Sequence, residues 1–248
     1  MIVKAFKTHK IKPEDDLFRI FDKYLPKLEE KEIVAISSKI VATCEGRVVK
    51  EGTVDKDELV KSESQYYIPR ETNPYNVTLT ITRNILAAAA GIDESNGNGY
   101  YILWPKDLQR SANKIREYLC KKFKRKYIGV ILTDSKTTPM RWGVTGIALA
   151  YSGFEGVKSL IGKKDLFGRK LEYTTVSVMD NLASSAILEM GESNEQKPLC
   201  VISDIPMVEF VDHNPTKKEL DEWKITMQED LYGEFLKNAP WKKGRGRA

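Results

Sequence analysis

An apolar run in the middle of this chain leads directly into an acidic, polar segment. The run from Tyr127 to Leu132 is followed by Asp134 and Ser135, then by turn-forming residues, then by the small apolar residues 147–150. This order predicts a buried strand, a polar loop and a new element. Loops at strand ends are where binding and catalytic groups concentrate, so Asp134 and Ser135 are candidate functional residues. An ordinary solvated loop is the alternative interpretation of this segment.

The composition suits a globular protein that binds anions. The chain has 248 residues, of which 41% are hydrophobic and 30% charged, and a net charge of +5. Basic clusters lie at 121–126 and 242–247. They could bind nucleic acid, but a solvated helix end and a loose tail are the favoured interpretation, because no nucleic-acid-binding motif accompanies them. An anionic, phosphate-bearing substrate also fits a mildly basic protein.

The cysteines predict a reducing compartment. Cys44, Cys120 and Cys200 are odd in number and widely spaced, without disulfide or zinc-site spacing. We therefore expect reduced thiols and a cytoplasmic protein. The N-terminal residues lack a signal-peptide core, and no segment has the length and apolarity of a membrane span, so no membrane association is expected.

Hydrophobic periodicity predicts a mixture of strands and helices. Strands are expected at 1–6, 33–36, 77–82, 100–103, 171–178 and 199–202, and helices at 14–25, 111–123 and 179–190. Residues 87–92 fit a helix by propensity and a close-packed strand or turn equally well. Beyond Pro206 the sequence is charged and helix-forming, and its basic end from Trp241 is expected to be disordered.

Two acidic segments and one lysine suggest a phosphate site. Asp93 to Asn96 and Asp134-Ser135 each follow an apolar segment, and Lys39 comes just after a predicted strand, beside two serines. Hard oxygen ligands with a nearby lysine suit Mg²⁺ or Mn²⁺ that bridges nucleotide phosphates. For the Lys39 segment alone, a helix start capped by a serine is the favoured alternative. Walker A, GxGxxG and kinase motifs are absent from the sequence.

These segments resemble motifs of a known family. Ser38 to Val41 with Glu45 to Arg47, and Ala90 to Asn96, are similar to motifs of the coenzyme F-420:L-glutamate ligases. Further matches are Asp134-Ser135 with Pro139, Arg141, Gly143 and Thr145, then 165–169, Leu171, Thr174 and the helix 180–191. The resemblance covers about residues 1–205 in the same order. It implies a catalytic region, with two interleaved subdomains as one arrangement, and a C-terminal helical extension over 206–248.

The resemblance implies a GTP-dependent ligase. Such enzymes join L-glutamate through its amine to a carboxylate of a deazaflavin precursor, forming a gamma-linked amide through an acyl phosphate. They use Mg²⁺ or Mn²⁺ and commonly K⁺. The implied fold is α+β, with mixed sheets and flanking helices, in an intertwined homodimer. The expected partners are therefore a nucleotide, glutamate, an anionic small-molecule acceptor and a second copy of the chain.

The resemblance also assigns roles to individual residues. Asp93 and Asp134 would be catalytic metal ligands, Ser135 a ligand of a second metal, and Glu192 a metal ligand where the family usually has glutamine. The expected nucleotide-binding residues are Thr8, His9, Lys10, Ile11, Ser38, Lys39 and Asn96.

The chain departs from the family after Ser135. Where the family usually has FGRPWRxGQTDVAIG, this chain has KTTPMRWGVTGIALA, so that Val144 and Gly146 replace a glutamine and an aspartate. Thr43 also stands where a lysine is usual. We interpret this as a protein that keeps the residues for metal and nucleotide binding and differs from the family in the residues that would contact the acceptor. One alternative is a ligase with a folate or peptide acceptor. Another is a protein that binds a nucleotide or metabolite but has lost turnover. Nucleic-acid binding is the weakest hypothesis.

Overall fold

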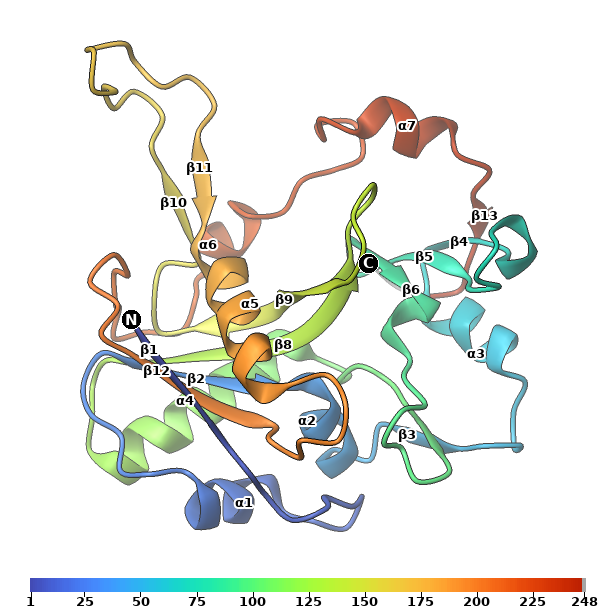
Figure 1. The fold of residues 1–248 in the computed structure, drawn as a ribbon, viewed down its shortest axis with the longest axis horizontal. Coiled ribbons are helices and arrows are strands. Elements are labelled where there is room, and N and C mark those ends of the chain that lie inside the picture. The colour runs from blue at the N-terminus through green and yellow to red at the C-terminus, as the bar shows by residue number, and fades with distance from the viewer. Residues whose placement is uncertain (247–248) are drawn as a thin grey trace.

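A five-stranded mixed sheet forms the centre of the computed structural model, which describes residues 1–246 (Figure 1). Its strand order is β1-β12-β2-β8-β9. Only β2 and β8 run parallel to each other, and the other neighbours are antiparallel. The α+β class expected from the sequence is confirmed. The strands are β1 (Ile2–Phe6), β12 (Leu199–Ser203), β2 (Glu32–Ser37), β8 (Ile128–Thr137) and β9 (Val144–Ser152).

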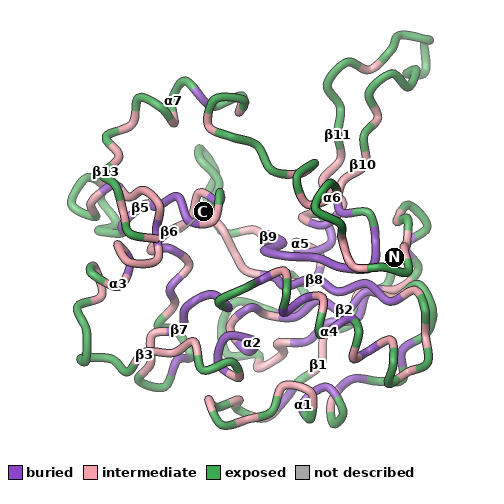
Figure 2. The backbone as a smooth tube through the Cα atoms, turned by 180° about the vertical axis from the view of Figure 1, so that it is seen from behind, coloured by how far each residue is buried: buried purple, intermediate pink, exposed green. Residues whose placement is uncertain are grey.

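Helices cover both faces of this sheet because its central strands are apolar on both sides. In β2, Val34 and Ile36 pack on the side of α1 (Leu17–Tyr24) and α4 (Leu108–Phe123). The alternate residues Ile33 and Ala35 pack on the side of α5 (Val178–Met190). Successive side chains of a strand point to opposite faces, so one short strand contributes to two cores. Figure 2 shows these central strands as buried.

The ends of the long helices follow local capping chemistry. Asp107 accepts a hydrogen bond from the backbone N–H of Arg110, so α4 begins at Leu108, earlier than the apolar spacing alone predicts. At the end of α5, Gly191 has a φ of +80°, which favours glycine, and it ends the helix as expected.

Residues between α2 (Ser38–Cys44) and α4 form a second body beside the central sheet. It holds a two-stranded ribbon of β3 and β7 and a four-stranded sheet of order β13-β4-β5-β6, in which β13 (Lys242–Lys243) comes from the C-terminal segment. Its elements are β3 (Val48–Lys50), α3 (Lys56–Glu63), β4 (Tyr66–Ile68), η1 (Arg70–Thr72), β5 (Leu79–Thr82), β6 (Ile85–Ala88), η2 (Ala89–Gly91) and β7 (Tyr100–Ile102). Of the two interpretations of residues 87–92, the close-packed strand and turn is correct. Ala89 and Ala90 have φ of +48° and +55°, which an α-helix excludes.

The polar loop expected at Asp134 and Ser135 is wrong in its position. Asp134 and Ser135 are not in a loop after a strand but within β8, which continues to Thr137 and forms a long hairpin with β9. The register shifts between Leu132 and Thr133, and pairing then resumes. Such a bulge lets a strand continue beyond its apolar part with a changed side-chain direction. The true loop is 138–143.

A narrow arm projects from the body between β9 and α5 (Figure 1). It is built on β10 (Val157–Ser159) and β11 (Thr175–Ser177), which pair antiparallel. The strand expected over 171–178 is therefore shorter than predicted. The turn expected at its tip is confirmed, since the Asp165 carboxylate accepts hydrogen bonds from the backbone N–H groups of Phe167 and Arg169, both at 2.9 Å.

The C-terminal segment crosses from the central sheet to the second body. It contains α6 (Lys217–Asp221), α7 (Gly233–Asn238) and β13 (Lys242–Lys243). The disorder expected from Trp241 onward is wrong up to residue 246, because β13 pairs with the edge strand β4, and Gly244 N–H donates to the Gln65 carbonyl at 2.8 Å. Residues 247 and 248 lie outside the described residues. No helix in 1–246 is both long and apolar enough to cross a bilayer.

Gly146 is required where α5 packs on β9, and its replacement tests this packing. A Cβ at this position would lie 2.6 Å from backbone atoms of Ala183 and Ser184. We expect Gly146→Ala to lower the free energy of unfolding by about 1–3 kcal/mol, because neither backbone can move away freely. Chemical denaturation measures this. Val144→Ala, at a half-exposed position on the same strand, should change stability by less than about 0.5 kcal/mol. Equal effects of the two variants would contradict the packing.

Candidate functional site

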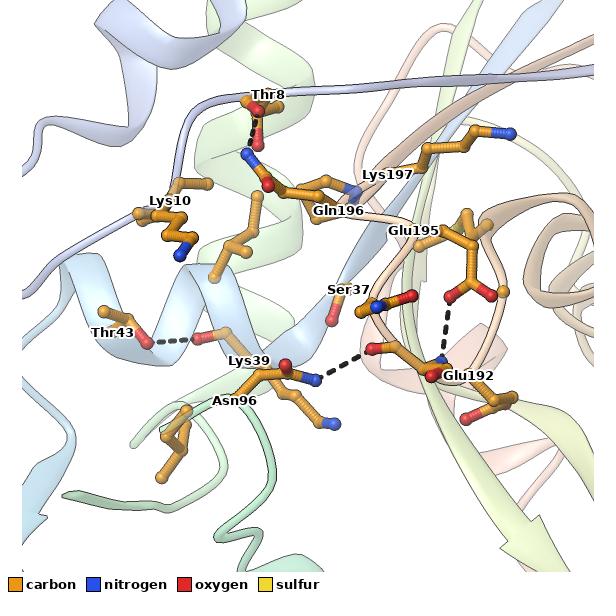
Figure 3. A pocket seen from close by; sticks show the side chains of 18 of the residues that line it. Thr8, Lys10, Ser37, Lys39, Thr43, Asn96, Glu192, Glu195, Gln196 and Lys197 are labelled. Carbon is orange, nitrogen blue, oxygen red and sulfur yellow. Dashed lines mark hydrogen bonds between the residues drawn. The ribbon is translucent and has the colours of Figure 1, made fainter. Parts of the chain in front are cut away.

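A cavity of about 580 Å³ is lined by the end of β2, by Thr133 to Ser135 within β8, and by the loop that follows α5. Polar and charged side chains from both ends of the chain line it (Figure 3). The lining residues are Thr8 to Lys12, Ser37, Lys39, Ile40, Thr43, Asn96, Asn98, Ile102, Thr133 to Ser135, Ile187 and Met190 to Pro198. The volume is that of a small-molecule site.

Lys39 stands in the first turn of α2, directly after β2. Its ammonium forms an ion pair with the carboxylate of Asp93 and donates to Ser95 Oγ at 3.4 Å. Burial of Asp93 opposes its ionisation, but hydrogen bonds and charge from Lys39, with help from Ser95, hold the pKa of Asp93 below its ordinary value. Asp93 is therefore a carboxylate at neutral pH, with Lys39 as its counter-ion.

Asp134 has a different environment. The indole N–H of Trp104 donates to its Oδ2 at 2.5 Å, and the backbone N–H of Ser135 donates to its Oδ1 at 2.9 Å. Burial is the main influence and raises the pKa of Asp134 to about 6, although both hydrogen bonds and the charge of Lys39 oppose the rise. The negative charge of Asp93 adds to it. The two carboxylates thus lie close enough to repel each other.

The loop after α5 forms one wall of the cavity. Ser135 Oγ donates to Glu192 Oε2 at 3.2 Å, which ties this loop to β8. The side-chain amide of Asn96 donates to the carbonyl of Ser193 at 3.0 Å, which ties the same loop to the second body (Figure 3). Residues distant in sequence are therefore joined around one opening.

The loop after β1 lies directly beside the loop after α5 at the cavity. Thr8 N–H donates to the Gln196 carbonyl at 3.0 Å, and the Gln196 amide donates to the Thr8 carbonyl at 2.5 Å (Figure 3). His9 is held through its two ring nitrogens, by Tyr24 Oη at 2.9 Å and by Asp15 Oδ2 at 3.0 Å. These bonds give the segment Thr8–Ile11 a defined position at the cavity.

Most residues expected in the site do line the cavity, and two do not. Ser38 is buried at 2% exposure inside the first turn of α2. Asp93 does not line the cavity itself, but it forms an ion pair with Lys39, which does. Trp104 and Gln196 also belong to the site, although neither was expected from the sequence. A signal existed only for Trp104, because a buried indole N–H needs an acceptor.

The departures after Ser135 lie outside the cavity lining. Gly146 faces α5, and Val144 is half-exposed on the hairpin. Thr43, a departure that comes earlier in the chain, does line the cavity, and its hydroxyl donates to the Lys39 carbonyl at 2.7 Å. The substituted hairpin residues therefore do not change the wall of the cavity.

The oxygen atoms present fit a hard divalent cation bound together with a phosphate substrate. Within residues 1–246, no three acidic, histidine or cysteine side chains converge into a metal-binding group by themselves. Mg²⁺, however, usually binds one or two carboxylates and completes its shell with water and substrate phosphates. Asp134 is hydrogen-bonded on both oxygens and still has free lone pairs, and Ser135 and Glu192 add oxygen atoms to the same cavity lining.

Comparisons with known proteins agree on one family. A sequence model described as F420-0:Gamma-glutamyl ligase matches residues 5–204. The chain is 36% identical over 220 residues to the coenzyme F420:L-glutamate ligase of Methanococcus maripaludis strain C7, covering 83% of this chain and 86% of that protein. It is 32% identical to the enzymes of the same name from Methanopyrus kandleri, with 77% and 82% covered, and Methanocaldococcus jannaschii, with 71% and 76% covered.

The environment of Asp134 predicts a pH dependence of stability in metal-free buffer. Because its folded-state pKa is raised from 3.8 to about 6, the folded protein holds this proton after the unfolded chain has lost it. The contribution of Asp134 to stability is therefore fully present at low pH and is lost as the pH rises from 3.8 to about 6. We expect the unfolding free energy of the wild type, relative to Asp134→Asn, to fall by on the order of 2–3 kcal/mol over this range.

Denaturation curves with a chelator, measured at several pH values for both proteins, check this expectation. The comparison with Asp134→Asn removes the contributions of the other titrating groups. A difference that stays constant with pH would show that Asp134 has an ordinary pKa.

Proposed function

Because the chain belongs to the F420-0:gamma-glutamyl ligase family, we propose that it uses GTP to join L-glutamate, through a gamma-linked amide, to a carboxylate of a deazaflavin F420 precursor. The relatives are named coenzyme F420:L-glutamate ligases and are matched over most of their length. The observation that carries the proposal is that Lys39, Asp93 and Asp134 meet beside a cavity that would hold a nucleotide.

The basic and polar wall of the cavity would bind the nucleotide. The base and ribose would contact Thr8, His9, Lys10, Ile11 and Asn96, which all line the cavity. The Lys39 ammonium, next to Asp93, is the cation closest to the two carboxylates and would contact phosphate oxygens. Ser38 would act through the backbone of the first turn of α2, since its side chain is buried.

The divalent metal would be bound by Asp134, Ser135 and Glu192 together with the nucleotide phosphates. Asp93 would become a further ligand when the Lys39 side chain leaves it to contact a phosphate. When bound, Mg²⁺ or Mn²⁺ neutralises charge that develops on the transferred phosphoryl group. The raised pKa of Asp134 is consistent with this role, because a buried carboxylate next to a second one is stabilised by a cation. K⁺ is a further expected requirement, taken from the family resemblance.

The proposed reaction has two steps. An oxygen of the acceptor carboxylate bonds to the γ-phosphorus of GTP, and the bond to the β–γ bridging oxygen breaks, which gives an acyl phosphate and GDP. The glutamate amine then attacks the acyl carbon, loses a proton and expels phosphate, which forms the amide. The protein holds both substrates in line at one site, which is the main contribution that a phosphoryl-transfer enzyme can make.

The departures from the family leave the lining of the cavity that would hold the nucleotide unchanged, apart from Thr43. The substitutions that suggested a folate or peptide acceptor, or a loss of turnover, lie on the hairpin and outside the cavity lining. Thr43 is the one cavity residue among them. We propose a deazaflavin acceptor because the relatives are named coenzyme F420:L-glutamate ligases.

An acceptor-dependent assay tests the proposed reaction. We expect the purified protein with GTP, Mn²⁺ and L-glutamate to release GDP when a deazaflavin carboxylate is added, with the glutamylated product visible by mass spectrometry. Folate and peptide carboxylates serve as comparison acceptors. If the protein binds GDP tightly but produces no GDP from GTP with any acceptor, it is a nucleotide-binding protein and not a ligase.

Lys39→Met tests the phosphate-binding role of the lysine. We expect kcat/KM for GTP to fall by about 100-fold or more, because a charge that contacts the transferred phosphoryl group is lost. Lys136→Met is the matched control, since Lys136 lies on the hairpin outside the cavity lining. Equal activity of the two variants would contradict the role.

We also propose the homodimer that the family resemblance implies. Four large apolar side chains at the tips of the hairpin and the arm are almost fully exposed: Met140, Trp142, Leu166 and Phe167, at 100%, 91%, 99% and 96%. Exposed apolar groups of this kind mark contact surfaces. We expect light scattering after size exclusion to give twice the chain mass of 28.2 kDa, and Leu166→Asp with Phe167→Asp to shift it toward the monomer. A monomeric wild type would contradict this.

A further inference from the structure

Trp104 connects the two acidic segments of the site. It follows β7 in the second body, is 5% exposed, and its indole N–H donates to Asp134 on the central sheet. A buried tryptophan supplies both packing area and one directed hydrogen bond.

The indole ring is held against the segment that carries Asp93. A Cβ on Gly91 would lie 2.1 Å from Cε2 and 2.4 Å from Nε1 of Trp104, so the ring rests directly on the glycine backbone. The φ of Gly91 is +72°, which also favours glycine. Asp93 and Ile102 exchange backbone hydrogen bonds of 2.9 and 2.8 Å, which fix this segment beside β7. The ring thus has no room to rotate away.

The backbone of Trp104 is held as well. Its carbonyl accepts a hydrogen bond from Arg47 Nε at 3.1 Å, and Arg47 also donates to Glu63 at 2.7 Å. The direction of the indole N–H is therefore set by packing on one side and by an arginine on the other.

We propose that Trp104 is a positioning residue that orients the Asp134 carboxylate for divalent-cation binding, an inference that rests on the proposed function. Trp104 holds Oδ2 and the Ser135 N–H holds Oδ1, so the plane of the carboxylate is set while each oxygen keeps a lone pair for a cation. Groups that hydrogen-bond to a metal-ligating side chain in this way raise metal affinity by fixing its orientation.

A purely structural role would give different results. If Trp104 only fills the core, removing its N–H while keeping its ring would change stability and leave cation affinity unaltered. The two roles are therefore separated by a variant that lacks the donor and keeps the shape.

The test measures Mn²⁺ binding to three proteins, with the free ion quantified by electron paramagnetic resonance. The proteins are the wild type, Trp104→Phe, and a protein with a benzothiophene in place of the indole of Trp104. The benzothiophene keeps the bicyclic shape and lacks the N–H. We expect both variants to bind Mn²⁺ about 10- to 100-fold more weakly than the wild type, with and without GDP. Trp241→Phe is the matched control, because it loses an indole hydrogen bond to the Leu236 carbonyl in the C-terminal segment. It should bind Mn²⁺ like the wild type.

A second readout uses turnover with GTP. We expect the Mn²⁺ concentration for half-maximal activity to rise in both Trp104 variants, while kcat at saturating Mn²⁺ recovers toward the wild-type value. Wild-type Mn²⁺ affinity in the benzothiophene protein would overturn the positioning role and leave the proposed function intact. Absence of Mn²⁺ binding by the wild type itself would instead overturn the metal site of the proposed function.

Discussion

The parallel pairing of β2 with β8 is the constraint on which the site depends. In this register Ser37 lies opposite Thr133, so the chain leaves β2 toward Lys39 next to the point where β8 reaches Asp134. Parallel neighbours need a long crossover, and here the crossover includes α2, the second body and α4. Residues of the second body are thereby returned to the same edge of the sheet. The cavity, its lysine and its carboxylates follow from this one pairing.

Charge balance explains how two carboxylates coexist at that edge. Asp93 has a lysine counter-ion and a lowered pKa, whereas Asp134 accepts hydrogen bonds from two neutral donors and has a pKa that burial raises. Burial of an unpaired carboxylate is costly unless hydrogen bonds or a cation offset the cost. The electrostatic strain is concentrated on Asp134, the group to which the indole of Trp104 donates. Such a distribution is typical of a site that binds a cation with its substrate.

The motifs were predictable from sequence to the extent that their chemistry is local. Asp93, Asn96, Lys39 and Asp134 are recognisable because they stand beside apolar segments with a fixed order. The position of Asp134 inside a strand was not predictable, because the bulge after Leu132 depends on the pairing of β8 with β9. The role of Gly146 was not predictable either. In the sequence it replaces an aspartate of the family, whereas the structure shows that α5 packs directly against its backbone. The ordered tail at Gly244 likewise depends on a free edge of β4, which no local pattern shows.

The sequence by itself determined the α+β class, the long helices with their caps, and the family to which residues 5–204 belong. These features depend on apolar spacing, capping residues and short motifs, all of which act over a few neighbouring residues. Only the tertiary structure decided that Thr8 is joined to Gln196, that Lys39 pairs with Asp93, and that Trp104 donates to Asp134. Those contacts join residues that are far apart in the chain, and their geometry is set by strand register and by the packing of the second body on the first.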